Sequence, residues 1–123
     1  MNWSAIAAVL LALAVILGAF GAHGLKARLD TLGTTPIWEK AAFYHLIHAL
    51  GILIVSIIPS TPLLPRNATE PVCWLLLIGI LVFSGSLYAL AITGTRALGA
   101  ITPIGGVCFI VGWLWLAFKL AQR

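Results

Sequence analysis

Residues 5–22 read AIAAVLLALAVILGAFGA and contain no strongly polar side chain. An uninterrupted apolar run of about 18 residues or more is long enough to cross the hydrocarbon core of a bilayer as an α-helix. A signal peptide is the competing interpretation, but it requires a basic segment ahead of a shorter apolar core. Because no Lys or Arg precedes Ala5, the stretch predicts a retained transmembrane helix over residues 4–23.

Three more apolar segments follow, and their ends carry recognisable helix signals. Thr35 can cap the second segment, Pro36 suits its first helical position, and Glu39 lies where the helix dipole is positive. Pro103 falls in the first turn of the last segment, where proline is tolerated. The prolines between residues 59 and 71 predict a stiff, extended connection. The predicted further spans are residues 36–58, 72–92 and 99–120.

The composition indicates one membrane domain over residues 1–123. Hydrophobic residues make up 62% of the chain and charged residues only 8%, whereas a soluble domain carries about 25% charged residues. The predicted fold class is therefore all-α, an integral membrane bundle of four transmembrane helices with short loops. The basic residues do not form the clustered face that nucleic-acid binding requires, so no nucleic-acid partner is expected.

The distribution of basic residues predicts an orientation. An even number of spans places both termini on one side of the membrane. Four basic residues flank the first and third connections, and three lie on the side of the termini: Lys26, Arg28, Lys40 and Arg96 against Arg66, Lys119 and Arg123. The positive-inside rule then predicts termini on the non-cytoplasmic side. Lys26 and Arg28 are also candidate contacts for anionic lipid headgroups, beside their simpler role as topology anchors.

The three histidines are the best candidates for a ligand site. His45 and His48 share a helix face with Tyr44, and His23 ends the first span. The short first connection predicts that all three histidines meet near one interface, where they could hold a metal, haem or a quinone. The alternative is that they hydrogen-bond across helices, as polar residues in membrane bundles commonly do.

Other chemistry is not indicated. All three acidic residues, Asp30, Glu39 and Glu70, lie in loops or at span ends. Ion-coupled transporters usually bury such groups along their path, so a small-solute transporter is the least favoured reading. Cys73 and Cys108 lack the CxxC spacing of zinc or redox sites, and no catalytic motif is present, so no enzyme activity is expected.

Small residues recur at helical spacing and predict close helix contacts. Such residues let membrane helices approach one another, within one chain or between two copies. Ser84 and Ser86 are expected to bond nearby helix carbonyls. The predicted packing positions are Gly18, Gly21, Gly24, Gly85, Ala89, Cys108 and Gly112.

Four ordered motifs together resemble a known family. They are GAFGAHGLK at residues 18–26, YHLIHAL at 44–50, FSGSLY at 83–88 and ITPIGG at 101–106. The chain resembles the bacterial domain of unknown function 423, which includes YgdD-like inner-membrane proteins and is similar to eukaryotic transmembrane protein 256. This resemblance implies a small multi-pass membrane protein and supplies no activity.

The expected function is a non-enzymatic accessory, structural or lipid-interacting component of the bacterial inner membrane. Its expected partners are membrane lipids, with a homo-oligomer or a larger membrane complex as a further prediction. No cofactor is predicted by this reading. The alternative is a haem-, metal- or quinone-binding protein that uses the histidines near the junction of the first two spans.

Overall fold

Four long helices make up the molecule. The computed structural model describes residues 1–123 and contains no strand. The long helices are α1 (Trp3–Ala22), α3 (Thr35–Ile57), α6 (Thr102–Ala121) and a continuous rod made of α4 (Arg66–Gly79), η2 (Ile80–Ser84) and α5 (Gly85–Thr93). All four are long and apolar enough to cross a membrane. The prediction of an all-α membrane bundle is confirmed.

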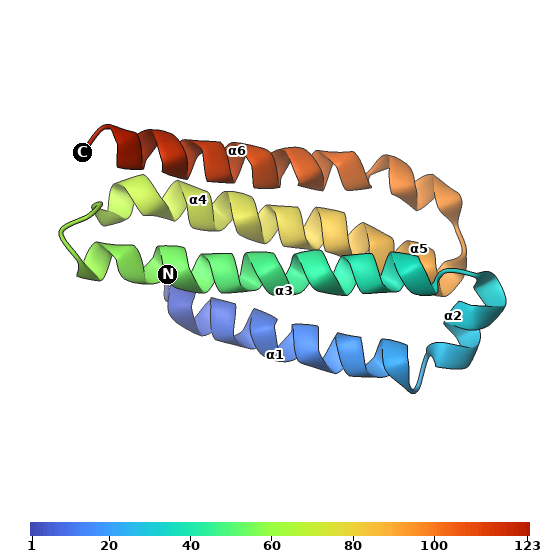
Figure 1. Cartoon of the computed structure of the whole chain (residues 1–123). Coiled ribbons are helices and arrows are strands. Elements are labelled where there is room, and N and C mark those ends of the chain that lie inside the picture. The colour runs from blue at the N-terminus through green and yellow to red at the C-terminus, as the bar shows by residue number, and fades with distance from the viewer.

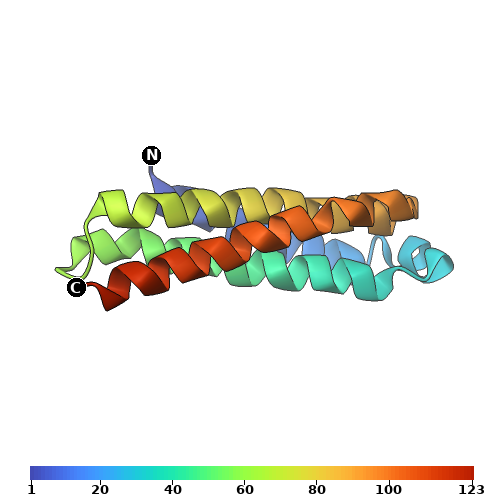
Figure 2. The same ribbon diagram turned by 90° about the horizontal axis from the view of Figure 1, so that it is seen from above.

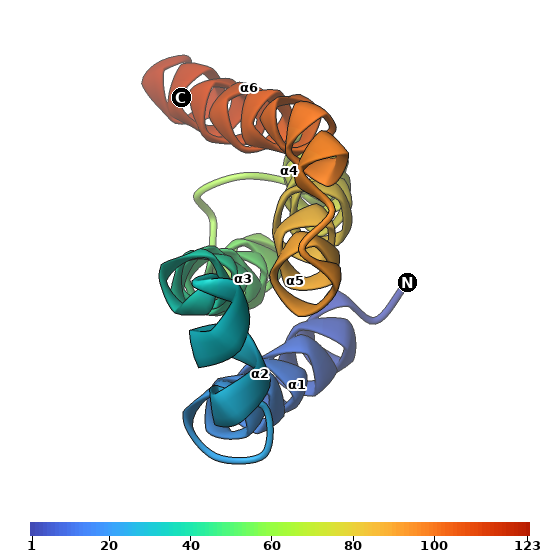
Figure 3. The same ribbon diagram turned by 90° about the vertical axis from the view of Figure 1, so that its right-hand side faces the viewer.

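The helices are arranged as an open row and not as a square bundle. Figure 3 shows α1 and α6 at opposite extremes, with α3 and the α4–α5 rod between them. α1 packs mainly on α3, while α6 packs on α4 and η2. Both termini lie at the end of the bundle where α3 connects to α4, and the short helix α2 (Lys26–Leu32) lies at the opposite end (Figures 1 and 2). We call these ends the terminal end and the α2 end.

The first connection is helical. α2 ends at Gly33, whose φ of 67° is left-handed and therefore suits glycine. The Leu29 side chain of α2 is fully buried against Trp38 and Ala91. The Thr34 hydroxyl donates to the Ala91 carbonyl at 2.6 Å, so this connection is bonded to α5 and closes the α2 end.

The proline-rich connection is shorter than the sequence predicts. After the single turn of η1 (Ile58–Ser60), α4 begins at Arg66 and not at residue 72. Pro65 adopts the extended conformation that precedes a helix, and Pro71 lies inside α4. The prediction that prolines exclude a helix up to residue 71 is wrong. The N–H that Pro71 lacks would bond to the carbonyl of Asn67, which lies in the exposed first turn, where water can replace the lost bond.

A second departure from the predicted spans lies ahead of the last helix. Residues Arg96–Ala100 form a short 3₁₀ segment, η3, and α6 begins at Thr102, not at residue 99. Gly94 ends α5 with a left-handed φ of 72°. Pro103 lies in the first turn of α6, where its missing N–H needs no helical partner.

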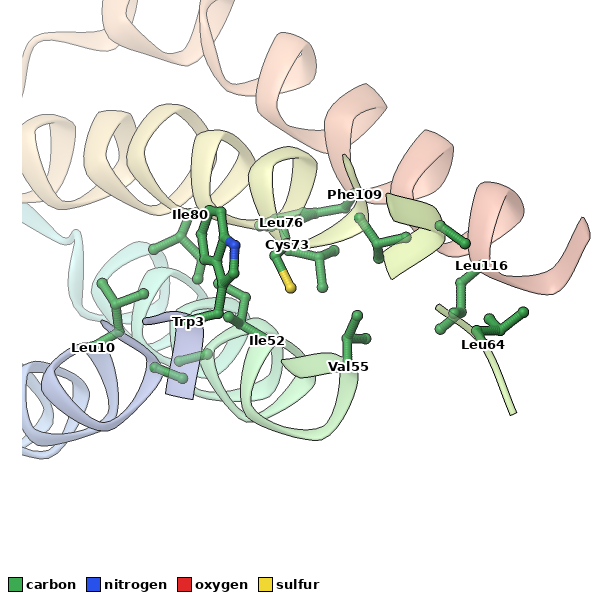
Figure 4. Close-up of a cluster of buried hydrophobic side chains, with 14 residues drawn as sticks. Trp3, Leu10, Ile52, Val55, Leu64, Cys73, Leu76, Ile80, Phe109 and Leu116 are labelled. Atoms are coloured by element: carbon green, nitrogen blue, oxygen red, sulfur yellow. The ribbon is translucent and has the colours of Figure 1, made fainter. Parts of the chain in front are cut away.

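The main core joins α1, α3, α4 and α6 near the terminal end. Figure 4 shows Trp3 of α1 beside Ile52 of α3 and Cys73 of α4, with Leu10 and Val55 on either side of them and side chains of α6 beyond. A second, smaller core lies around Trp38 at the α2 end. The row of helices is thus held together at both ends, while the outer faces of α1 and α6 stay exposed.

Close helix contacts occur at glycines that the spacing rule only partly identifies. A Cβ on Gly105 would stand 2.3 Å from the Phe83 nitrogen, so α6 touches the backbone of η2. Added Cβ atoms on Gly79 and Gly51 would likewise stand 2.4 Å from Phe109 and 2.9 Å from Trp113. None of these three glycines was predicted as a packing position, because each contact depends on which face meets a neighbour.

The predicted packing residues have mixed placements. Gly21 receives the ring of Trp38, and a Cβ there would stand 2.3 Å from it. Gly112 lies against Leu75 and Leu76 at 3.3 Å. Added Cβ atoms on Gly18 and Gly85 meet nothing within 4 Å, and one on Gly24 meets only Phe20, so these glycines do not make close helix contacts. Ala89 and Cys108 are half-buried.

Candidate functional site

His45 lies buried between three helices. It belongs to α3, and its Nδ1 is 3.0 Å from the hydroxyl of Tyr88 on α5. Tyr88 also packs on Trp38, with ring centroids 4.7 Å apart. The Nε2 atom of His45 is buried without a partner. This histidine therefore joins α3 to α5 through Nδ1.

His48 is also buried, but it faces a different helix. Its Nδ1 donates to the Tyr44 carbonyl at 2.8 Å, one turn earlier on α3, which fixes the tautomer because a carbonyl can only accept. Its ring stacks on Phe109 of α6 with centroids 3.5 Å apart. The Tyr44 ring is partly exposed and packs on Phe83 at 4.6 Å. These aromatic contacts fill the space between α3, η2 and α6.

His23 stays apart from the other two histidines. It is exposed at the end of α1 and lines a mainly apolar pocket of about 320 Å³ with Ile16, Ala19, Phe20 and Gly24. No group of three or more His, Cys, Asp or Glu side chains is arranged to hold a metal ion. The predicted meeting of three histidines at one interface does not occur, because His45 and His48 point to different neighbours and His23 points outward.

The two candidate headgroup contacts of the first connection are engaged within the chain. Lys26 pairs with Asp30 at 2.7 Å, and Arg28 donates to the Ile92 carbonyl at 3.0 Å. The hydrogen bond from Lys26, followed by one from Thr35, lowers the pKa of Asp30, while the same bond to Asp30 raises the pKa of Lys26. Both basic residues are exposed, so they can still meet lipid. The Arg28 bond joins α2 to α5, whereas the Lys26–Asp30 pair lies within α2.

The terminal end holds a polar pocket that sequence reasoning missed. It has a volume of about 490 Å³ and lies where the start of α1, the end of α3 and the start of α4 meet. Hydroxyl, amide and charged groups line it, and it is more polar than the other pockets of this mainly apolar chain. It is lined by Met1, Asn2, Trp3, Ser4, Ser56, Pro59, Ser60, Arg66, Thr69, Glu70 and Cys73.

Hydrogen bonds connect the walls of this pocket. Ser56 donates to the Leu53 carbonyl at 2.6 Å, so Ser4, 2.9 Å away, donates to Ser56 and joins α1 to α3. Arg66 donates to the Met1 carbonyl and holds the first residues of the chain against α4. The walls of the pocket are therefore fixed by bonds between segments that lie far apart in the sequence.

The only feature of the sequence that could have indicated this pocket was the presence of polar residues at three span ends. Ser4 and Ser56 are separated by 52 positions, and nothing in their spacing shows that these helix ends are neighbours. The pocket was therefore not predictable from the motifs.

The comparison with known families decides the classification. A family model described as Protein of unknown function (DUF423) matches residues 17–106. The chain belongs to the DUF423 family. The resemblance inferred from the four motifs is confirmed, since the match spans all of them.

Individual relatives of this DUF423 protein are named only as membrane proteins. A UPF0382 membrane protein of Staphylococcus epidermidis is 53% identical over 104 residues, which cover 85% of this chain and 82% of the relative. One from Staphylococcus saprophyticus is 54% identical over 85% of this chain and 83% of its own length. UPF0382 membrane protein YwdK of Bacillus subtilis is 43% identical with the same coverage. No solved structure matches the chain.

Three of the four DUF423 motifs pack against one another. Gly105 in the fourth motif touches Phe83 in the third, and Tyr88 in the third bonds His45 in the second. Ser84 of the third motif also donates to the carbonyl of Ala41, one turn before the second. The motif residues thus specify how the helices fit together. The pocket at the terminal end lies mostly away from them, and its residues 1–4 fall outside the matched segment.

Proposed function

We propose that this DUF423 protein is a non-enzymatic, lipid-interacting component of the bacterial inner membrane that holds a lipid headgroup in the terminal pocket. The observation that carries the proposal is the polar hollow of about 490 Å³ at one end of an otherwise apolar bundle. Its lining comes from the ends of three membrane-length helices, and this position supports a pocket at the depth of the headgroups once the helices span a bilayer.

Acyl chains would find apolar surface beside this pocket. The outer face of α1, whose first residues line the pocket, exposes Val9, Leu13 and Ile16. In water such faces would drive aggregation, whereas in a bilayer they contact lipid tails at no cost. A lipid can therefore meet polar groups at its head and apolar helices along its chains.

The histidines support the alternative of a haem, metal or quinone site less well. His45 uses Nδ1 for Tyr88, and His48 uses Nδ1 for a backbone carbonyl and one ring face for Phe109. Both histidines lie on the same helix, and bis-histidine haem ligation within one chain needs its two ligands on facing helices. Absorbance spectra and metal analysis of the purified protein check this alternative directly.

We also propose that the terminal end faces the non-cytoplasmic side. The α2 end carries Lys26, Arg28, Lys40 and Arg96, against Arg66, Lys119 and Arg123 at the terminal end. The excess of basic residues favours the cytoplasm for the α2 end. A cysteine introduced after Arg123 should react with a membrane-impermeant maleimide in intact cells, whereas one introduced at Thr95 should react only after lysis. The reverse labelling pattern contradicts this orientation.

Lipid retention tests the function. Protein purified in mild detergent should carry tightly held phospholipid that survives detergent exchange and is counted by native mass spectrometry. Ser60→Trp places a large ring at the mouth of the pocket and should remove that lipid. Thr95→Trp, at an exposed position of the α2 end, is the matched control and should leave it bound. Wild-type protein that retains no lipid, or equal retention in both variants, contradicts the proposal.

A further inference from the structure

We propose that the terminal pocket selects an aminophospholipid, a lipid whose headgroup carries both a phosphate and a primary ammonium group. This inference rests on the proposed function and names the chemical class of its ligand. The reason is that the pocket presents donors for an anion and acceptors for a cation at the same time, without neutralising one with the other.

The donors come from Arg66 and Trp3. Arg66 is the first residue of α4, which starts without a side-chain cap, so the helix dipole adds to its positive charge. One of its nitrogens bonds the Met1 carbonyl, which leaves the rest of the guanidinium available. Trp3 is only 5% exposed, yet its indole N–H has no partner in the chain. In Figure 4 this nitrogen lies on the ring edge turned toward Cys73, which lines the same pocket.

A buried N–H without an acceptor is unusual, because leaving it unpaired costs about as much as losing a hydrogen bond. A phosphate oxygen in the pocket would supply that acceptor. It would also give the guanidinium of Arg66 a charge-assisted partner with matching geometry. The Trp3 N–H and the Arg66 guanidinium are therefore the expected contacts of the anionic part of the ligand.

The acceptors come from Glu70 and three of the four hydroxyls that line the pocket. The hydroxyl hydrogens of Ser4, Ser56 and Thr69 are committed to partners within the protein. Their oxygens can therefore only accept further bonds, which suits the N–H groups of an ammonium and not the oxygens of a phosphate. Glu70 is half-buried and lines the same space with a carboxylate.

Arg66 and Glu70 do not satisfy each other. They are four residues apart on α4, a spacing at which opposite charges commonly pair. The one ion pair in the chain within 4.0 Å nevertheless joins Lys26 and Asp30 at the other end. A headgroup with separated positive and negative charges can meet Arg66 with its phosphate and Glu70 with its ammonium, whereas an anionic headgroup would pair with Arg66 and leave Glu70 without a partner.

Lipid-binding measurements on the full chain test this selection. The delipidated protein in detergent is titrated with phosphatidylethanolamine, phosphatidylglycerol or phosphatidylcholine and followed by native mass spectrometry. Phosphatidylethanolamine should bind about tenfold more tightly than the other two, since one charge-assisted hydrogen bond is worth roughly that factor. Phosphatidylglycerol lacks the ammonium, and phosphatidylcholine lacks its N–H donors.

Variants assign the two halves of the site. Glu70→Gln should lower phosphatidylethanolamine binding to the level of phosphatidylglycerol, and Arg66→Gln should weaken both lipids, while Arg66→Lys keeps the charge and restores part of the affinity. Trp3→Phe retains the ring without the N–H and should weaken both lipids severalfold. Glu39→Gln and Arg96→Gln, exposed at the α2 end, are the matched controls and should bind as wild type. Unchanged far-UV circular dichroism shows that each variant is folded.

Each remaining outcome decides the matter. Equal binding of the three lipids by wild-type protein, or a preference that survives Glu70→Gln, overturns the selection while leaving the broader lipid role standing. If the wild-type protein binds none of the three lipids, the proposed function itself is contradicted. Free phosphoethanolamine should not displace the lipid at equal concentration, because it lacks acyl chains. If it binds as tightly as the lipid, the ligand is a soluble phosphoamine and the lipid assignment is overturned.

Discussion

The contact between α6 and the π-helical segment η2 gives a sharp test of the fold. Gly105→Ala adds a Cβ that would stand 2.3 Å from the Phe83 nitrogen, 2.7 Å from its Cβ and 2.8 Å from its Cα. Two of these three atoms are backbone, so they cannot rotate away as a flexible side chain would. To relieve the clash, α6 has to move off η2.

The expected size of the effect follows from two opposing terms. Overpacking a close contact costs about 1–3 kcal/mol, and backbone obstruction places this case near the upper limit. Replacing glycine by alanine within a helix returns up to about 1 kcal/mol. Gly105→Ala should therefore lower the free energy of unfolding by about 2 kcal/mol.

Gly85→Ala is the matched control. It makes the same chemical change within a membrane helix, but apart from the adjoining backbone of its own helix no atom lies within 4 Å of the added Cβ. It should leave stability unchanged or raise it by up to about 1 kcal/mol. Two identical substitutions should thus differ by about 2–3 kcal/mol, for a reason that lies only in their surroundings.

Equilibrium unfolding in mixed micelles with increasing SDS, followed by far-UV circular dichroism, measures this difference. A Gly105→Ala variant that unfolds at the same SDS fraction as Gly85→Ala would refute the reasoning. It would mean that α6 does not press on η2 as the structure describes.

Three further predictions concern hydrogen bonds and charge. Ser84→Ala removes an interhelical bond whose carbonyl keeps its own helical partner, so the same unfolding assay should show a loss of only about 0.6 kcal/mol. Tyr88→Phe leaves Nδ1 of His45 buried without a partner and should cost more, about 1–3 kcal/mol; a smaller loss than for Ser84→Ala contradicts this ranking. The hydrogen bond from Lys26 lowers the pKa of Asp30. The pair therefore stabilises α2 fully above the ordinary carboxyl pKa of about 4, and this stabilisation is lost as the pH falls through the lowered pKa. Asp30→Asn should abolish this acid-side change in the amide NMR shifts of residues 26–34, and a change that persists in the variant assigns it to another group.

Much of the fold was predictable because lipid imposes a simple constraint on the chain. Backbone polar groups have no water partners in the hydrocarbon core, so each long apolar run must form a helix. The run at residues 5–22 therefore became α1 without reference to the rest of the molecule. The polar connections were harder to predict, since α2 depends on burying Leu29 against two other helices.

The candidate site was predicted less well than the fold. The histidines were identified as unusual residues in an apolar chain, and two of them are indeed buried between helices. Their partners were not predictable, because a spacing of three residues shows that His45 and His48 share a broad face but not which neighbour each one meets. The terminal pocket was not predicted either, because residue spacing does not show which helix ends are neighbours.

By itself, the sequence determined that the chain crosses a membrane four times, that both termini share one end and that it belongs to the DUF423 family. These properties depend on local composition and on motif order. Only the tertiary structure decided that α1 and α6 lie at opposite edges of an open row, that Gly105 touches Phe83, and that Arg66 and Glu70 share a hollow with Trp3. Such contacts depend on how each helix is rotated about its axis, and that rotation is set by the packing of all four helices together.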